Sequence, residues 1–309
     1  MPGRTPTRAA APARTTTGRG LWPGLLRAAR PRQWTKNVLV LAAPLAAGRW
    51  LPGEAGRLAV VGLLFVIASS GVYFLNDSLD VEADRRHPAK RDRPIAAGDV
   101  PLPLARVVGG VLAVAAPAAT YALCNGRTTA LIGGYVVVQI AYSLFLKHIA
   151  LIDLAVVASG FLMRAMAGGL ALGIPLSGWF LVTTAFGALF AVSAKRFSEA
   201  VAAGPQGGGR DVMGQYTEGY LRFVWQLAAV ATVMAYCLWA LDDRPATAAE
   251  SLPWRQLSVL PFVLGVLRYA MFAERGVAEA PEDIVWRDRG LGALALAWAG
   301  LYGLALSGL

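Results

Sequence analysis

The feature that most constrains this chain is a series of long apolar runs, such as LAVVGLLFVIASSGVYFL at residues 58–75. Each run is long enough to cross the ~30 Å hydrocarbon layer as a helix. At that depth only helices and closed barrels satisfy their own backbone groups, and these runs are too long for barrel strands. With 56% hydrophobic residues among 309, the sequence therefore predicts an all-α integral membrane protein.

Breaks made by Pro, Gly and charged clusters divide the apolar sequence into nine expected spans. The first is the least regular, because Pro44 interrupts it, and an interfacial start anchored by Trp34 is an alternative. A count of eight spans would move the C-terminus across the membrane. The expected spans lie at about 34–51, 58–77, 103–122, 128–146, 150–172, 177–195, 221–241, 256–273 and 290–308.

The distribution of basic residues predicts the orientation in the membrane. With nine spans, the N-terminus and the loops after spans two, four, six and eight lie on one side, and they hold 23 of the 29 Lys and Arg residues. The opposite loops hold five, and Arg164 lies inside the fifth span. Because Lys and Arg are enriched on the cytoplasmic side, we expect a multi-pass protein of the inner (plasma) membrane with this face in the cytoplasm.

The N-terminal segment differs in composition from the rest of the chain. Residues 1–30 are rich in Arg, Thr, Pro and Ala and contain no acid, so we expect a disordered cytoplasmic tail. Its bases are expected to contact anionic lipid rather than nucleic acid. Residues 31–309 would then form one transmembrane catalytic domain.

A dense charged segment, NDSLDVEADRRHPAKRDRPIAAG at residues 76–98, follows directly on the second expected span. On a helix, Asn76, Asp80 and Asp84 repeat every four residues, and Asp77 lies one turn before Asp80 on nearly the same face. Such a stripe of oxygen ligands, with room for water and phosphate, suits Mg²⁺. We therefore predict that the four oxygen-bearing side chains of Asn76, Asp77, Asp80 and Asp84 converge on a Mg²⁺ ion.

Basic side chains follow the acids in the same segment. Arg grips phosphate oxygens in a bidentate manner and Lys acts as a point charge, so a metal beside several bases predicts a diphosphate site. The alternative is that the acids form a solvated helix end and that the bases serve only as a topology signal. The substrate-binding bases predicted here are Arg85, Lys90, Arg91 and Arg93.

The pattern N-D-x-x-D-x-x-x-D, read from Asn76 to Asp84, resembles the first Asp-rich motif of the UbiA superfamily of intramembrane prenyltransferases. The resemblance implies nine helices around a cavity open to lipid, with a diphosphate held through Mg²⁺. The second motif of that family, D-x-x-x-D, belongs after the sixth helix, where this sequence reads AKRFSE. Lys195 and Glu199 stand at the positions of the two acids, so an ammonium group replaces one expected metal ligand.

The chain is similar to one branch of that superfamily from about residue 30 to its end. This branch transfers 5-phosphoribose from 5-phosphoribosyl 1-diphosphate to a polyprenyl (decaprenyl) phosphate in the membrane. The resemblance therefore implies a Mg²⁺-dependent glycosyltransferase with a soluble sugar diphosphate donor and a lipid acceptor, acting in cell-wall arabinan synthesis. The matching runs include RPRQWTKNVLV at 30–40, YS-x-x-LKH at 142–148, SGFLMRAMAGG at 159–169 and KRF-x-E at 195–199.

Further residues are assigned to substrate in the light of this resemblance. A charge inside a span usually faces a polar cavity, so Arg164 is expected to bind substrate phosphate rather than to form a structural ion pair. The structural competitor is Asp153, but it lies about three helical turns away, so direct pairing on the same helix is not expected. Lys147 ends the fourth span and either guides the lipid phosphate or anchors the helix at the interface. The resemblance implies that Asn76, Asp80 and Asp84 bind Mg²⁺ and that the catalytic residues are Asp77, Asp80, Asp84 and Lys195. The predicted substrate-binding set is completed by Lys36, Tyr142, Lys147, Arg164, Arg196 and Glu199.

Other functions remain open at this stage. An aromatic-acceptor prenyltransferase that uses a prenyl diphosphate is the nearest alternative, and the KRFSE segment at 195–199 argues against it. A transporter of anionic solutes would line a path with buried charges, whereas the charges here gather at one face. A scaffold subunit of a cell-envelope complex would show no turnover. The sequence leaves open whether the protein forms a homo-oligomer.

Overall fold

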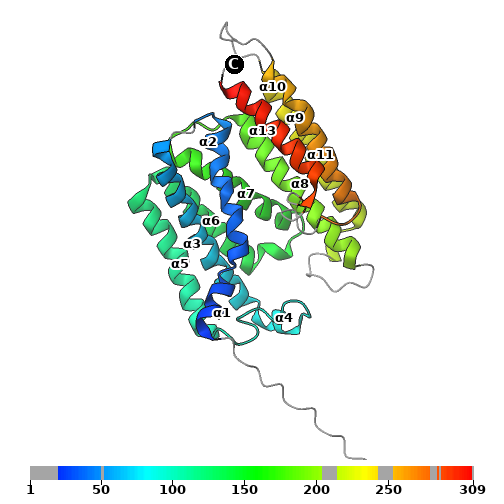
Figure 1. Cartoon of the computed structure of the whole chain (residues 1–309). Helices are drawn as coiled ribbons and strands as arrows, with labels where there is room; N and C mark the ends of the chain where they lie inside the picture. The colour runs from blue at the N-terminus through cyan, green and yellow to red at the C-terminus, as the bar shows by residue number, and fades with distance from the viewer. Residues whose placement is uncertain are drawn as a thin grey trace, which may run out of the picture.

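The computed structural model describes residues 20–49, 52–203, 214–242, 253–278, 284 and 287–307. Every regular element within these ranges is helical (Figure 1). Seven of the helices are long and apolar enough to cross a membrane. They are α3 (Ala55–Leu79), α5 (Leu102–Leu123), α7 (Ile152–Ala171), α8 (Gly178–Ala203), α9 (Glu218–Leu241), the consecutive pair α10 (Trp254–Leu257) and α11 (Val259–Glu274), and α13 (Arg289–Ser307).

Two of the nine expected spans are not among these seven helices. Helix α6 (Gly126–Leu144) occupies the fourth expected span but is not among these seven helices, since Arg127 and Gln139 make it less apolar. The first expected span is a 3₁₀ helix, η1 (Pro31–Leu41), followed by the short α2 (Ala42–Ala46). A total of nine membrane crossings therefore stays a prediction.

This first segment contains Pro44 and packs closely on α7. Pro44 has no backbone N–H, so it cannot donate to the carbonyl of Val40 one turn earlier. That carbonyl instead lies against Gly168 of α7, where a Cβ atom would come within 2.0 Å of the Val40 oxygen. The segment departs from regular α-helical geometry, and its backbone packs directly on α7.

Two apolar clusters form the core, and α7 contributes to both. One cluster lies between η1, α3, α5, α6 and α7 and includes Phe65, Ile132 and Ala167. The other lies between α7, α8, α9 and α11 and includes Leu154 and Phe197. Helix α3 runs beside α5 and α8 beside α9, so α7 joins two groups of helices (Figure 1).

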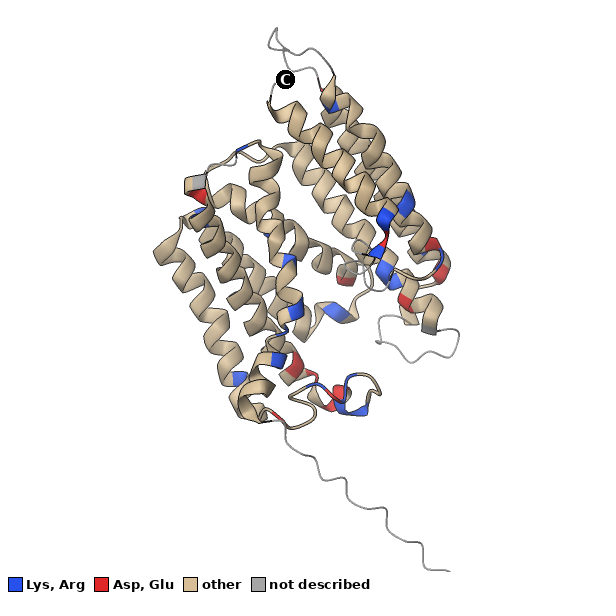
Figure 2. Ribbon diagram, viewed as in Figure 1, with Lys and Arg blue, Asp and Glu red and all other residues tan. Residues whose placement is uncertain are grey.

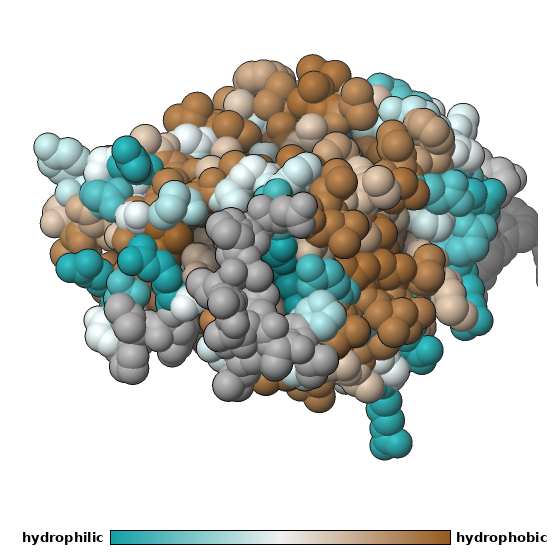
Figure 3. All heavy atoms as spheres, turned by 90° about the horizontal axis from the view of Figure 1, so that it is seen from above, coloured by the Kyte–Doolittle hydropathy of each residue, from teal (hydrophilic) through white to brown (hydrophobic). Residues whose placement is uncertain are grey.

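The outer faces of the bundle are apolar. On α5, Val107, Val111 and Val114 are exposed at spacings of four and three residues, and α9 exposes a similar stripe that includes Leu227 and Val230. The end-on view in Figure 3 shows broad hydrophobic areas beside patches of hydrophilic side chains. Such stripes on a soluble protein would face water, whereas a lipid environment accepts them.

A short helix precedes the first span. Leu21–Ala28 form helix α1, which lies at the end of the bundle where α3 ends (Figure 1). Ala28 is buried with Phe74 of α3 and Ile95, and Arg27 forms an ion pair with Asp99. The predicted tail of residues 1–30 thus ends in a packed helix, and its residues 1–19 lie outside the described residues.

Candidate functional site

Most charged residues in the described part of the chain lie toward one end of the bundle (Figure 2). There α3 ends and α4 (Val81–Arg86) follows, and a loop leads on to α5. The 3₁₀ turn η3 (Leu146–His148) and the start of α7 reach the same region. This end therefore brings together segments that carry most of the predicted site residues.

The acidic motif crosses the junction between α3 and α4. Asp80 lies between the two helices with φ −91° and ψ 6°. Backbone hydrogen bonds continue through the junction, from Asp80 N to Asn76 O at 2.9 Å and from Asp84 N to Asp80 O at 2.8 Å. The expected four-residue repeat is therefore kept, although it does not lie on one uninterrupted helix.

Two of the acids are buried and share one arginine. Arg93 Nη1 donates to Asp77 Oδ1 at 3.1 Å and to Asp84 Oδ2 at 2.8 Å. Asp77 Oδ1 also accepts from Arg30 Nη2 at 2.6 Å. The two carboxylates are only 3% and 4% exposed, so their charges depend on these guanidinium groups. Arg30 was missed by the sequence-based assignment, although it opens the RPRQWTKNVLV run.

The third acid has a different partner. Asp80 Oδ1 accepts from Lys147 Nζ at 2.5 Å, so η3 is tied to the end of α3. The Asp80 side chain is 28% exposed, which makes it the most accessible of the three carboxylates. Lys147 and Asp80 were both predicted site residues, and the structure brings them together from positions 67 residues apart.

A second polar cluster connects α6, α7 and α8. Asp153, which is fully buried, accepts from Arg196 Nε at 3.1 Å and from the Tyr142 hydroxyl at 2.5 Å. Arg196 also donates to Glu199 at 2.8 Å, and Lys195 Nζ lies 3.9 Å from the same carboxylate. Four predicted site residues thus lie around Asp153, namely Tyr142, Lys195, Arg196 and Glu199. From the sequence alone, Asp153 is considered only as a partner for Arg164.

Arg164 lies deep in α7 with neutral partners. It donates from Nε to Asn37 Oδ1 and from Nη2 to the Tyr135 hydroxyl, both at 2.9 Å, and from Nη1 to the Gly160 carbonyl at 2.7 Å. Its guanidinium carbon lies 4.9 Å from the centre of the Tyr135 ring. As expected from their separation along α7, Asp153 is paired with another residue, Arg196. Phosphate binding by Arg164 stays a prediction.

The remaining predicted residues lie around these clusters. Lys36 Nζ lies 5.4 Å from the centre of the Phe161 ring. Arg85 donates to the Ala96 carbonyl and pairs with Glu82. Lys90 and Arg91 lie in the loop after α4, where their backbone N–H groups donate to the His87 carbonyl.

The connector before the last helix makes its own ion pair. Asp288 accepts from Arg268 Nε at 2.6 Å and from Nη2 at 2.8 Å, and these hydrogen bonds lower the pKa of Asp288 to about 2. Asp288 also accepts from the backbone N–H of Leu291 and so caps α13. The charges of this connector therefore fasten α13 to α11.

Burial also changes the acid strength of the motif. Asp84 lies outside the membrane-spanning helices, and its burial raises its pKa above the ordinary 3.8, while the charge of Arg93 acts in the opposite direction. A carboxylate that is costly to keep ionised gains more from a cation than an exposed carboxylate does. Asp84 is thus suited to a site where positive charge is always present.

The donor set fits a hard cation in its chemistry. Asn76, Asp80 and Asp84 offer amide and carboxylate oxygens, which Mg²⁺ prefers. In the described part of the chain, no group of three or more His, Cys, Asp or Glu side chains is gathered as a metal site. Asn76 is not one of these residue types, and Lys147 and Arg93 occupy oxygens of Asp80 and Asp84.

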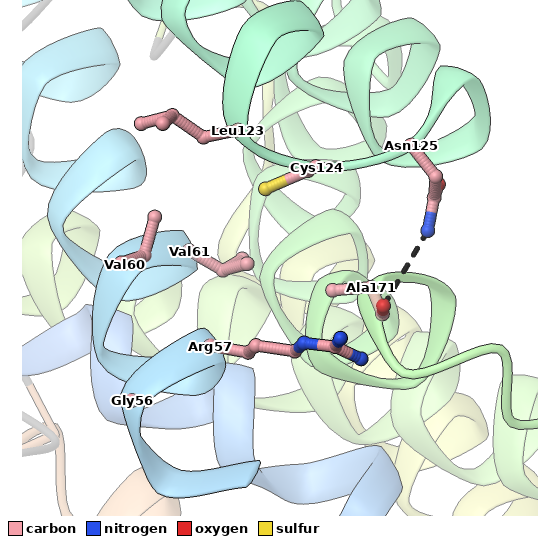
Figure 4. A pocket seen from close by; sticks show the side chains of 8 residues that line it. All are labelled: Gly56, Arg57, Val60, Val61, Leu123, Cys124, Asn125 and Ala171. Carbon is pink, nitrogen blue, oxygen red and sulfur yellow. Dashed lines mark hydrogen bonds between the residues drawn. The ribbon is translucent and has the colours of Figure 1, made fainter.

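A separate pocket lies where α3 and α6 begin and α5 and α7 end (Figure 4). Its volume is about 410 Å³. Arg57 points into it, and the Asn125 amide donates across it to the carbonyl of Ala171. No carboxylate is among its lining residues, so it lacks the ligands of the predicted metal site. The lining residues are Gly56, Arg57, Val60, Val61, Leu123, Cys124, Asn125 and Ala171.

The helical bundle, its apolar outer faces and the charged cluster at one end define a multi-pass membrane protein. The UbiA prenyltransferase family profile matches residues 38–279, and the chain belongs to this family. The fold also resembles a UbiA homologue from Archaeoglobus fulgidus bound to GPP and Mg²⁺, with a TM-score of 0.68 and 16% identity over 93% of this chain and all of that one. A digeranylgeranylglyceryl phosphate synthase has a TM-score of 0.65 at 12% identity, covering 94% of this chain and 99% of the other.

Other relatives are more similar to this chain in sequence than the proteins of these two structures are. The decaprenyl-phosphate phosphoribosyltransferase of Mycolicibacterium smegmatis is 44% identical over 93% of this chain and 94% of its own length. The protein of the same name from Mycobacterium tuberculosis is 45% identical over 92% of this chain and 94% of its own length. The resemblance inferred from the motifs is therefore confirmed by the family profile and by these relatives of 44–45% identity.

Proposed function

We propose that this protein transfers 5-phosphoribose from 5-phosphoribosyl 1-diphosphate to a polyprenyl phosphate in the membrane and releases diphosphate. The observation that carries the proposal is the 44–45% identity, over more than 90% of both chains, to two mycobacterial decaprenyl-phosphate phosphoribosyltransferases. The product would serve the synthesis of cell-wall arabinan. No observation favours the aromatic-acceptor or transporter alternatives over this one.

The distribution of charge supports a reaction between a soluble and a lipid substrate. Acids and bases gather at one end of the bundle, while its sides expose valine and leucine stripes. The positive-inside rule favours a cytoplasmic location for that end, where a water-soluble sugar phosphate would arrive. A polyprenyl chain would lie along the apolar side and bring only its phosphate to the charged end.

The proposed reaction is a displacement at ribose C1. An oxygen of the acceptor phosphate forms a bond to C1 while the bond from C1 to the diphosphate oxygen breaks, and diphosphate leaves with the electron pair. A phosphate monoester has a second pKa near 6, so the acceptor is mostly dianionic at neutral pH and requires no separate base. Catalysis then depends on positioning and on the stabilisation of charge.

The residues of this chain would divide those tasks. Asn76, Asp80 and Asp84 would hold Mg²⁺, which neutralises the departing diphosphate when it is bound. Arg93 and Lys147 are already placed at these acids, within hydrogen-bonding distance, and would bind phosphate oxygens beside the metal. The cluster around Asp153 would hold Lys195 and Glu199 toward the same end of the bundle.

The proposal is tested by transfer of radiolabelled phosphoribose to decaprenyl phosphate by the purified protein, with and without Mg²⁺. We expect Asp80→Asn to reduce labelling of the lipid by about a hundredfold or more, because a metal ligand and a charge are lost. Glu54→Gln removes a charge at the start of α3, away from the acidic motif, and serves as the matched control. Prenylation of an aromatic acid from a prenyl diphosphate, with no labelled lipid, would support the alternative enzyme.

A further inference from the structure

We propose that Mg²⁺ and the donor diphosphate bind this site only together, because internal bases neutralise the acidic motif until a diphosphate draws those bases away. The inference rests on the proposed function for the identity of the donor. It concerns three acids, Asp77, Asp80 and Asp84, and three bases that are their counter-ions, Arg30, Arg93 and Lys147.

The charges of this set balance before any ligand arrives. Arg93 pairs with both Asp77 and Asp84, and Lys147 pairs with Asp80. Since Asp77 and Asp84 are almost fully buried, removal of their cations without replacement would leave isolated negative charges in a poorly solvated place. Removal of these bases is therefore unfavourable unless another cation takes their place.

The balance also disfavours the metal by itself. Mg²⁺ on Asp80 and Asp84 would bring two further positive charges beside Lys147 and Arg93, whose side chains are only 16% and 28% exposed. A diphosphate resolves this conflict, because its oxygens accept hydrogen bonds from the displaced bases while the acids turn to the metal. Each charge then keeps an opposite partner throughout binding.

The backbone at Arg30 is held in an unusual conformation. It has φ 56° and ψ 64°, the left-handed region that a residue with a side chain rarely adopts. The preceding carbonyl, of Ala29, accepts hydrogen bonds from Trp34 Nε1 at 3.1 Å and from Ser70 Oγ at 3.3 Å, which hold this turn in place. A backbone held in this way at a charged site is a sign of preorganisation.

The side chain of Arg30 is held as well. Its guanidinium carbon lies 4.8 Å from the centre of the Tyr73 ring, and Nη2 reaches Asp77. The side chain is nevertheless 29% exposed, so donors remain for a phosphate. We therefore assign Arg30, together with Arg93, to the diphosphate, and Asp77 to the positioning of both arginines rather than to the metal.

If the exchange occurs, removal of one base should tighten the binding of Mg²⁺ alone, which a simple loss of function would not do. Lys147→Gln removes the base from the most exposed acid, Asp80, and should make binding of Mg²⁺ alone about tenfold tighter, which corresponds to about 1.4 kcal/mol. Phosphoribose transfer by the same variant should fall. Arg57→Gln removes one positive charge near the start of α3, where no acid lines the pocket, and should leave both properties unchanged.

The binding experiment uses calorimetry with Mg²⁺ alone and equilibrium dialysis with radiolabelled inorganic diphosphate at increasing Mg²⁺. Wild-type protein should bind Mg²⁺ weakly and retain diphosphate only when Mg²⁺ is present. Arg30→Gln should weaken this joint binding without tightening that of Mg²⁺ alone, since Arg93 still neutralises Asp77.

Two results would overturn the proposal. One is binding of Mg²⁺ alone to wild type as tightly as to Lys147→Gln, and the other is retention of diphosphate in the absence of metal. If Lys147→Gln does not fold, the wild-type dialysis with and without Mg²⁺ decides the question. Joint binding without phosphoribose transfer would contradict the proposed function alone, whereas transfer with independent binding would contradict only the exchange.

Discussion

At the scale of single residues, Asp153 is a buried carboxylate that holds several of the predicted site residues together. It holds Arg196 and the Tyr142 hydroxyl, and Arg196 in turn holds Glu199. Asp153 and Arg196 lie in different helices, and their side chains are 0% and 6% exposed. The pair therefore fixes the distance between α7 and α8 at the charged end.

We predict that Asp153→Ala destabilises the protein by about 3–5 kcal/mol, because the positive charge of Arg196 stays buried without this partner. Thermal unfolding in detergent measures the effect. Tyr142→Phe is the matched control, since it removes one hydrogen bond to the same carboxylate and should cost about 1 kcal/mol. Equal losses in the two variants would mean that the ion pair does not support the fold.

At the scale of elements, the contact between η1 and α7 depends on glycine. The backbone of η1 approaches α7 so closely at Gly168 that a Cβ atom would lie 2.0 Å from the Val40 oxygen. The neighbouring Gly169 is also tightly packed, where a Cβ atom would lie 2.7 Å from Leu176. Gly168 and Gly169 of α7 thus lie at a close contact, whereas a Cβ atom at Gly134 of α6 would meet nothing within 4 Å.

We predict that Gly168→Ala separates η1 from α7 and lowers both the thermal stability and the activity, since Lys36 and Asn37 lie on η1. The expected loss of stability is about 1–3 kcal/mol, as for other overpacked sites. Gly134→Ala makes the same chemical change in open space within a helix and should be neutral or stabilising by up to about 1 kcal/mol. Similar unfolding temperatures for both variants would contradict the role of the close contact.

At the scale of the whole molecule, the bundle has one strongly charged end and one weakly charged end (Figure 2). Exposed Ala89 lies in the loop after α4, and exposed Gly126 begins α6 at the opposite end. With 23 of 29 Lys and Arg residues assigned to one side, the positive-inside rule predicts that Ala89 faces the cytoplasm. This orientation is needed for a donor that enters from the cytoplasm.

The orientation can be measured after Cys124 and Cys237 have been replaced by Ala. A membrane-impermeant maleimide should label Ala89→Cys in inverted vesicles but not in intact cells. Gly126→Cys should show the reverse pattern. Labelling of both variants from the same side would contradict an odd number of crossings between them, and inverted patterns would place the charged end outside the cell.

The sequence by itself determined the fold class and the position of the acidic motif. Apolar runs near twenty residues have few structural solutions in a membrane, and the four-residue repeat predicts that Asn76, Asp80 and Asp84 follow one another turn by turn. The departure from the family pattern at Lys195 and Glu199 was also visible in the letters alone. These features depend on composition and on the period of the helix, which are local properties.

Only the tertiary structure decided which charges neutralise one another. Arg30 and Asp77 are 47 residues apart, Lys147 and Asp80 are 67 apart, and Asp153 and Arg196 are 43 apart. A helical period relates residues a few turns apart on one helix, but it says nothing about which helices pack together. Ion pairs between helices follow from that packing, so neither the counter-ions of the motif nor the partner of Arg196 could be identified from the sequence alone.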